Sequence, residues 1–236
     1  FYYYSTLALA LCPIGATLLP SGGWVGSLWM ALAIAATYVG ARRSRLTLRY
    51  HGAAITLTAL MATGTLAAAL TSALGTLELH LMEFEHLAVS ALVFVCGGVM
   101  ASTPLPRDAE WTRRLPLAVM VGVGAGLVIG LLSQATIRFW PGDDMPDLAS
   151  LAAVRTIAGC LVAVALVVAT RAFHRPEPAW LVTPLLVILG GKLFIEDMGA
   201  GSSATRFIGF LMYGVAWIAA AKTVRFKRRK ADPDHP

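Results

Sequence analysis

Eight apolar stretches make up nearly all of this chain, and their repetition limits what the chain can fold into. Each stretch is close to the roughly 20 residues that an α-helix needs to cross a lipid bilayer. A chain that is 57% hydrophobic and 14% charged also has too few polar side chains to cover a soluble globule of this size. The sequence therefore predicts an all-α fold, a polytopic transmembrane helix bundle of about eight spans: residues 1–19, 24–41, 50–72, 80–102, 116–137, 149–171, 178–197 and 204–222.

The basic residues between these stretches fall almost entirely in every second connection and in the carboxy-terminal tail. Fifteen of the nineteen lie on that one side of the predicted bundle. Loops rich in Lys and Arg stay in the cytoplasm, so we expect both termini to be cytoplasmic. We also expect a transmembrane domain over residues 1–222 and a basic cytoplasmic tail over residues 223–236. The basic residues on this side are Arg42, Arg43, Arg45, Arg49, Arg107, Arg113, Arg114, Arg171, Arg175, Lys222, Arg225, Lys227, Arg228, Arg229 and Lys230.

Several function classes are disfavoured by composition alone. The net charge of +6 does not indicate nucleic-acid binding, because six basic residues form the tail beside the last span, where charge fixes orientation or contacts anionic lipid. Cys12, Cys96 and Cys160 lie inside apolar stretches without metal-ligand spacing, so we expect them to be small buried side chains.

The chain begins at Phe1 with no basic residue before the first stretch, so we expect it to be part of a longer protein. The expected partners are membrane lipids and other membrane subunits, with no cofactor.

Charged residues within or beside the spans are the best candidates for a functional site, because a charge in hydrocarbon costs several kcal/mol unless it is paired or hydrated. Arg155 lies inside the sixth stretch, and Lys192 lies inside the seventh, one helical turn before Glu196. The predicted topology places them in the outward-facing half, together with acidic and histidine residues near the start of the fourth stretch. The candidate outer-half polar cluster consists of Arg155, Lys192, Glu196, Asp197, Glu83, Glu85 and His86.

Two interpretations of this cluster remain open. In the first, the two cations meet carboxylates in an outward-facing vestibule that binds a substrate or ion. In the second, Arg155 and Lys192 extend toward the headgroups while the carboxylates stand in water. If Lys192 is paired, Glu196 is its first candidate partner, because residues four apart lie on one helix face.

No catalytic or metal-binding motif adds to this cluster. Glu83 and His86 have the Glu-x-x-His spacing found in di-iron helix bundles, and His80 stands nearby. A di-iron site needs a second such pair, which the chain lacks, so we predict no metal site. The chain also lacks a Gly-x-Ser-x-Gly elbow and a His-Glu-x-x-His zinc pattern, so no catalytic residue is assigned.

The fifth stretch carries a pattern that concerns packing. Gly122, Gly126 and Gly130 recur at four-residue spacing on one face of the expected helix. Glycines at this spacing let another helix backbone approach closely in membranes. We therefore predict that this face touches another helix.

The last two stretches carry a family resemblance. Lys192, Phe194 and Asp197 form a Lys-x-Phe-x-x-Asp run, and Arg206, Phe210 and Gly214 form an Arg-x-x-x-Phe-x-x-x-Gly run. These runs resemble the closing two spans of the bacterial domain-of-unknown-function 2339 family, and residues 46–52 resemble a loop-to-span entry of that family less closely. The resemblance implies a polytopic bacterial membrane protein with more spans than this chain holds. It supplies no activity, and Lys192, Asp197 and Arg206 are matched positions without a known role.

Three function classes follow. We favour a non-enzymatic scaffold or subunit of an envelope complex, multi-pass in the bacterial inner membrane, because catalytic motifs are lacking and helix-packing residues are plentiful. The alternatives are a transporter or channel segment with an outward-facing charged vestibule and a membrane enzyme that acts on a lipid-linked substrate.

Overall fold

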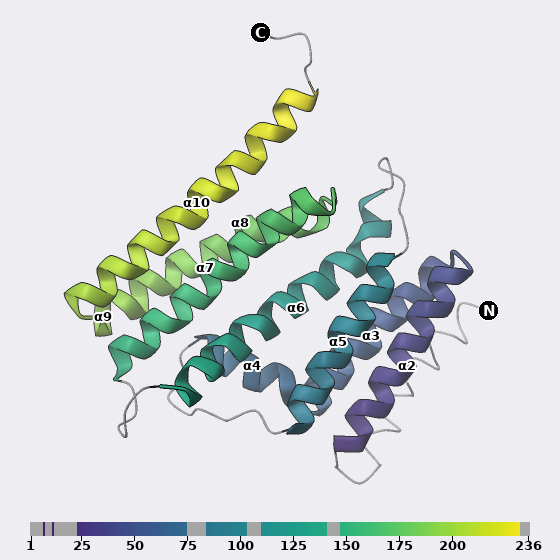
Figure 1. Ribbon diagram of the computed structural model, residues 1–236. Helices are drawn as coiled ribbons and strands as arrows, with labels where there is room; N and C mark the ends of the chain where they lie inside the picture. The colour runs from purple at the N-terminus through teal and green to yellow at the C-terminus, as the bar shows by residue number, and fades with distance from the viewer. Residues whose placement is uncertain are drawn as a thin grey trace. The chain divides into compact units, whose positions relative to one another are not determined.

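The computed structural model describes Leu7, Leu11 and residues 23–74, 84–102, 110–140 and 147–231, and every element in these ranges is a helix (Figure 1). Within these ranges, six helices are long and apolar enough to cross a membrane, and the number rises to seven if the bent pair α3–α4 is one span. The predicted all-α fold with several membrane-type helices is confirmed for these residues. The first predicted span, apart from Leu7 and Leu11, lies outside the described residues, as do Cys12, Glu78, His80 and Glu83.

The chain divides into two compact units. Unit 1 comprises Phe1–Ala68 and Leu81–Leu127, and unit 2 comprises Ala69–His80 and Val128–Pro236. Helices α4 (Thr65–Leu74) and α6 (Trp111–Arg138) begin in unit 1 and end in unit 2.

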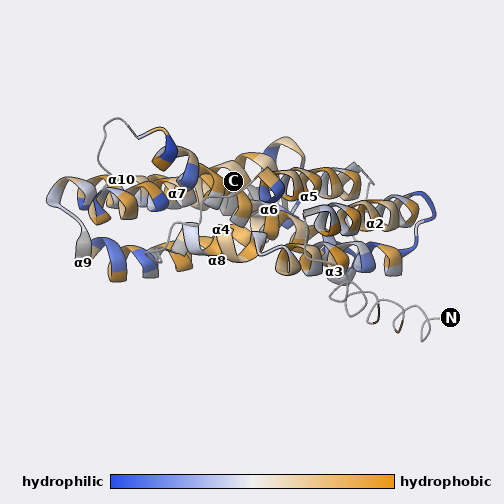
Figure 2. Cartoon of the chain, turned by 90° about the horizontal axis from the view of Figure 1, so that it is seen from below, coloured by the Kyte–Doolittle hydropathy of each residue, from blue (hydrophilic) through white to orange (hydrophobic). Residues whose placement is uncertain are grey.

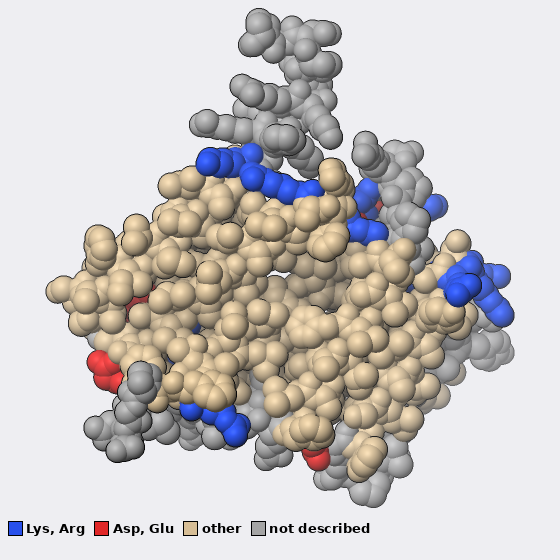
Figure 3. Space-filling model, in the orientation of Figure 1, with Lys and Arg blue, Asp and Glu red and all other residues tan. Residues whose placement is uncertain are grey.

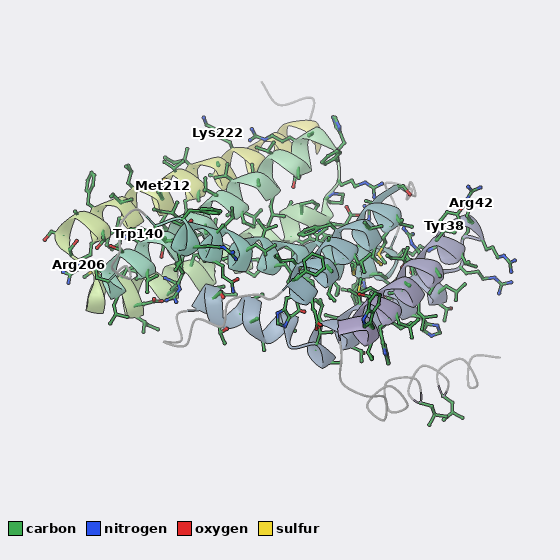
Figure 4. All side chains as sticks on the ribbon, turned by 60° about the horizontal axis from the view of Figure 1, so that its bottom comes forward. Tyr38, Arg42, Trp140, Arg206, Met212 and Lys222 are labelled. Atoms are coloured by element: carbon green, nitrogen blue, oxygen red, sulfur yellow. The ribbon has the colours of Figure 1, made fainter. Side chains whose placement is uncertain are left out.

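Unit 1 is built on α2 (Gly23–Arg42), which packs against both α3 (Leu46–Ala62) and α5 (Phe84–Ser102) (Figure 1). Small residues let these helices approach closely. A Cβ added at Gly52 of α3 would collide with the Thr37 hydroxyl of α2, and one added at Gly26 would collide with the Thr63 methyl group. At the far end of α2, the Arg42 guanidinium lies 5.2 Å from the centre of the Tyr38 ring (Figure 4).

The third predicted span, residues 50–72, is not one straight helix. It is divided into α3 and α4, which meet at an angle of 75°. Gly64 adopts a φ of +71°, a left-handed conformation that glycine adopts without steric cost. The hydroxyls of Thr63 and Thr65 lie 2.8 Å apart across the bend, and His86 Nε2 lies 3.0 Å from the Thr63 carbonyl oxygen. These side chains supply polar partners where the helical hydrogen-bond ladder is interrupted.

Unit 2 is built on three long helices that run side by side: α7 (Leu148–Ala172), α8 (Glu177–Lys192) and α10 (Ser203–Ala231) (Figure 1). A short π-helix, η1 (Leu193–Asp197), and the three-residue helix α9 (Met198–Ala200) join α8 to α10. Leu189 of α8 fills the space left by Gly159 of α7. The Tyr213 hydroxyl of α10 packs at Gly190 and donates to the Leu186 carbonyl over 3.1 Å. Apolar contacts, small residues and this hydrogen bond therefore contribute to holding the three helices together.

The predicted glycine contact face of α6 is only partly present. A Cβ added at Gly130 would stand 2.9 Å from the Ala69 Cα, so α4 and α6 touch backbone to backbone in unit 2. A Cβ added at Gly126 would meet no atom within 4 Å in the part of the chain that the structure describes. Among the described residues the predicted close contact is therefore present at Gly130 and not seen at Gly126.

The helix surfaces are predominantly apolar. Figure 2 shows hydrophobic residues along the helices and hydrophilic residues mainly near their ends. On the face in Figure 3, Lys and Arg gather in patches near its edges, and most of the other described surface is neither acidic nor basic. An extended apolar surface of this kind suits contact with lipid or with other membrane helices.

Candidate functional site

Three helix ends meet at the candidate site in unit 2: α7 begins there, α8 with η1 ends there, and α10 begins there (Figure 1). Asp147 fixes the start of α7, since its side chain accepts a hydrogen bond of 3.0 Å from the Ser150 backbone N–H. Hydrogen bonds from the Ser150 side chain and then from its backbone lower the pKa of Asp147 below its ordinary value of 3.8. The cap starts α7 so that Ala152, Arg155 and Thr156 follow within its first turns.

Lys192 makes more polar contacts than the other cation of the site, Arg155. Its Nζ lies 3.1 Å from Glu196 Oε2 and 3.3 Å from Asp197 Oδ1. The same nitrogen donates to the Ala152 carbonyl and to Thr156 Oγ1, both over 3.1 Å. The pair with Glu196 is the one that the four-residue spacing predicts. Only 7% of the Lys192 side chain is exposed, so it does not extend away from the protein as a snorkelling lysine would.

Arg155 links the site to the end of α4. Its Nε donates to the Ser72 carbonyl over 3.0 Å, and its Nη1 lies 3.2 Å from Glu196 Oε1. Ser72 is in the last turn of α4, where carbonyls lack partners within the helix and a cation is favoured by the helix dipole. The Ser72 hydroxyl in turn accepts a hydrogen bond of 2.8 Å from Gln134 Nε2 of α6. Arg155 thus satisfies the end of a helix and binds a carboxylate with the same guanidinium.

A π-helical turn brings both acidic residues to Lys192. In η1 the backbone bonds span five residues, as when Met198 N–H donates to the Leu193 carbonyl. Glu196 follows Lys192 by four residues and Asp197 follows it by five. Because the π-helical turn is wider than an α-helical turn, both acidic side chains lie on the same face of the helix as Lys192. Asp197 is buried, and its other oxygen accepts a hydrogen bond of 2.8 Å from Thr156 Oγ1. π-helical turns occur frequently at functional sites.

These five residues, Arg155, Thr156, Lys192, Glu196 and Asp197, form what we call the ion-pair cluster. It contains two basic and two acidic side chains, so their formal charges cancel. Three of the charged side chains are almost fully buried, whereas 24% of the Glu196 side chain is exposed. A buried charge is tolerated only when it is paired and hydrogen-bonded, and the cluster meets this condition.

The other members of the predicted cluster lie elsewhere or outside the described residues. Glu85 and His86 belong to the first turn of α5, in unit 1, where His86 contacts the Thr63 carbonyl. Within the described ranges, no group of three His, Cys, Asp or Glu side chains is placed to hold a metal ion.

Three participants were not identified from the sequence: Thr156, Ser72 and Gln134. All are buried polar residues inside apolar helices. Thr156 follows Arg155 directly, and a hydroxyl beside an intramembrane cation is a usable signal. Ser72 acts through its backbone carbonyl as well as its hydroxyl, and the sequence carries no signal for a carbonyl contact.

Comparison of the chain with protein-family models, with curated proteins and with solved structures found no match. The resemblance to the domain-of-unknown-function 2339 family therefore stays a prediction. What the ion-pair cluster does has to follow from its own geometry and from the helices around it.

Proposed function

We propose that this chain is part of a multi-pass bacterial inner-membrane protein that acts as a non-enzymatic scaffold or subunit of an envelope complex. The observation that carries the proposal is the exposed apolar surface of α10. Among the described helices that could span a membrane, α10 is the least buried. Only 11% of its apolar 18-residue segment lies inside the structure, against 67% for α7. A helix with so little burial in its own chain is available to lipid and to neighbouring membrane helices.

The exposed residues of α10 surround most of its circumference. Gly209 and Ala216 are buried toward the rest of unit 2, whereas large apolar side chains cover the remaining directions. Arg206 lies near the start of α10 and Lys222 near the end of its apolar part (Figure 4). The exposed side chains are Phe207, Ile208, Phe210, Leu211, Val215, Trp217 and Ile218.

The ion-pair cluster supports the same proposal. Its cations are bonded to carboxylates, hydroxyls and carbonyls of the same unit, which is how a structural charge is stabilised in a membrane interior. The positive-inside bias further assigns both chain ends to the cytoplasm and the ion-pair cluster to the outward-facing half.

Site-specific photocrosslinking in native membranes tests the scaffold role. A crosslinking residue at Leu211 should give a discrete protein adduct, whereas the same residue at the buried Ala216 should react only within the chain. Adducts with lipid alone at Leu211, Val215 and Ile218 would contradict a scaffold that uses this helix. Cysteine labelling tests the orientation: a Cys at Asp144 should react from outside and a Cys at Arg228 from the cytoplasm.

A second candidate function, a transporter or channel segment, is favoured by two specific observations. The bend between α3 and α4 and the π-helical turn η1 are interruptions of the kind that build transport sites. Proton or ion flux through proteoliposomes, lost on Glu196→Gln and retained on Glu85→Gln, would favour this candidate over the scaffold. Equal flux in the two variants would count against it.

A further inference from the structure

The side chain of Glu196 occupies the ion-pair cluster in the way that a bound anion would. Its two carboxylate oxygens contact different cations: Oε1 lies 3.2 Å from Arg155 Nη1, and Oε2 lies 3.1 Å from Lys192 Nζ. A phosphodiester has two equivalent oxygens that can make the same pair of contacts. Glu196 is also the most exposed charged residue of the cluster, with 24% of its side chain accessible against 4% for Arg155 and 7% for Lys192.

Both cations are held in place by other groups. Arg155 is fixed through Nε to the Ser72 carbonyl, which leaves the outer end of its guanidinium directed at Glu196. Lys192 is fixed by the Ala152 carbonyl, Thr156 Oγ1 and Asp197. If Glu196 moved away, the two cations would therefore remain where they are, and a preorganised pair of cations binds an anion without an ordering cost.

The cluster is electrically neutral only when one negative charge occupies the position of Glu196. Arg155 and Lys192 carry two positive charges, and the buried Asp197 supplies one negative charge that Thr156 also binds. Without Glu196 the cluster has one uncompensated positive charge, which is costly where both cations are buried in the protein. A singly charged ligand would restore neutrality as well as Glu196 does.

A third cation, Arg206, lies close to the same turn and has an unused donor. Arg206 packs its side-chain stem near Gly201, whose backbone N–H donates to the Asp197 carbonyl over 2.9 Å. Arg206 Nε is buried and has no hydrogen-bond partner among the residues that the structure describes. A buried donor without a partner is the feature expected where an ion or water is bound.

We propose that Arg155 and Lys192 form a binding site for a phosphodiester anion, and that Glu196 is the internal occupant that such a ligand displaces. The site lies beside η1, at the end of the candidate span Glu177–Asp197, so it is at the depth where lipid headgroups supply phosphodiesters. Soluble phosphate esters present the same chemistry from the aqueous side. This inference goes beyond the scaffold proposal and does not depend on it.

The test uses the purified full chain with Glu196→Ala, which removes the internal occupant. The chain is reconstituted in nanodiscs of phosphatidylcholine, with and without phosphatidylglycerol, and its melting temperature is measured in inorganic phosphate against chloride of equal ionic strength. The apparent affinity for the anion should rise by about tenfold or more over the unsubstituted chain, because a tethered carboxylate competes at an effective concentration on the order of millimolar. Glu85→Ala, an exposed carboxylate in unit 1, is the matched control and should show no gain.

The arms of the experiment separate the two sources of phosphate. Stabilisation by inorganic phosphate in phosphatidylcholine discs supports a soluble phosphate ester, and stabilisation by phosphatidylglycerol alone supports a lipid headgroup. Arg155→Lys in the Glu196→Ala background should abolish either gain, because lysine cannot bond Ser72 and the anion with one planar group. A folded Glu196→Ala chain that responds to neither anion, or that responds no more than Glu85→Ala, overturns the proposal. If Glu196→Ala and Glu196→Gln both fail to fold, Glu196 is a structural residue and the proposal is also wrong.

Discussion

Both units bury charged side chains, but with different contacts: in unit 1 the buried Arg49 donates to the Met100 carbonyl over 2.8 Å, whereas in unit 2 buried cations contact carboxylates. In unit 1 the buried contacts between helices include uncharged hydroxyl and thiol groups: Thr37 Oγ1 lies 3.4 Å from Cys96 Sγ, and Thr56 Oγ1 donates to the same sulfur over 3.8 Å. In unit 2 the helices meet at an ion-pair cluster whose charged members lie 3.1 to 3.3 Å apart. Sulfur is a weak hydrogen-bond acceptor, whereas a carboxylate beside a cation in a low-dielectric interior forms a strong contact.

The comparison teaches that packing and charge pairing respond differently to mutation. A weak neutral contact can be replaced by an apolar group of the same shape at little cost. A buried ion pair that loses one partner leaves an uncompensated charge, which costs much more. The ion-pair cluster of unit 2 should therefore be more sensitive to single polar substitutions than the neutral contacts at Cys96 in unit 1.

The largest expected effect is that of Lys192→Met. Its removal leaves the buried Asp197 without a cation and should lower the free energy of unfolding by about 3–5 kcal/mol. The measurement is denaturant or thermal unfolding in detergent micelles. Lys222→Met, at an exposed lysine of α10, should leave stability unchanged. Adding Asp197→Asn to Lys192→Met should recover part of the lost stability. A Lys192→Met chain as stable as its parent would show that the ion-pair cluster does not stabilise the fold.

The second-largest expected effect is a difference in lost stability between two matched threonine substitutions, one in each unit. Thr156→Val removes a hydroxyl that accepts from Lys192 and donates to Asp197, so we expect a loss of about 1.5–3 kcal/mol. Thr37→Val removes a contact to sulfur and should cost less than about 1 kcal/mol. Both side chains are fully buried, so burial does not explain the difference. Equal losses, measured by the same unfolding assay, would remove the distinction between the units.

The third effect compares two glycines of α6. Gly130→Ala places a methyl group 2.9 Å from the Ala69 Cα and should cost about 1–3 kcal/mol through overpacking. Gly126→Ala meets open space among the described residues and should be neutral or stabilising by about 0.5–1 kcal/mol, because alanine favours the helix. Thermal unfolding of the two variants provides the check. A destabilising Gly126→Ala would reveal a close contact at that position.

The smallest effect is a pH dependence at the start of α7. Because the pKa of Asp147 is lower in the folded chain than its ordinary value of 3.8, its stabilising contribution is fully present above that value. The contribution is lost as the pH falls through the lower, folded pKa. Asp147→Asn, which retains a capping oxygen but does not titrate there, should show a flatter melting temperature between pH 5 and pH 3, a window chosen around that ordinary value. Identical pH profiles would show that Asp147 does not titrate with folding.

The sequence by itself determined the helical, membrane-type fold and one contact of the site. Apolar stretches of about 20 residues predict spanning helices because an unpaired backbone is not tolerated in lipid. The four-residue spacing of Lys192 and Glu196 predicts their ion pair, because that spacing is local to one helix. The buried free thiols of Cys96 and Cys160 agree with their apolar surroundings in the sequence.

The tertiary structure alone decided which distant residues complete the cluster. Ser72 and Arg155 are 83 residues apart, and Thr156 and Asp197 are 41 apart, so no local spacing relates them. The bend at Gly64 and the π-helical turn at Leu193–Asp197 also depend on the groups that satisfy the interrupted backbone. Helical periodicity determines which residues share a face of one helix, whereas the packing of several helices determines which faces meet.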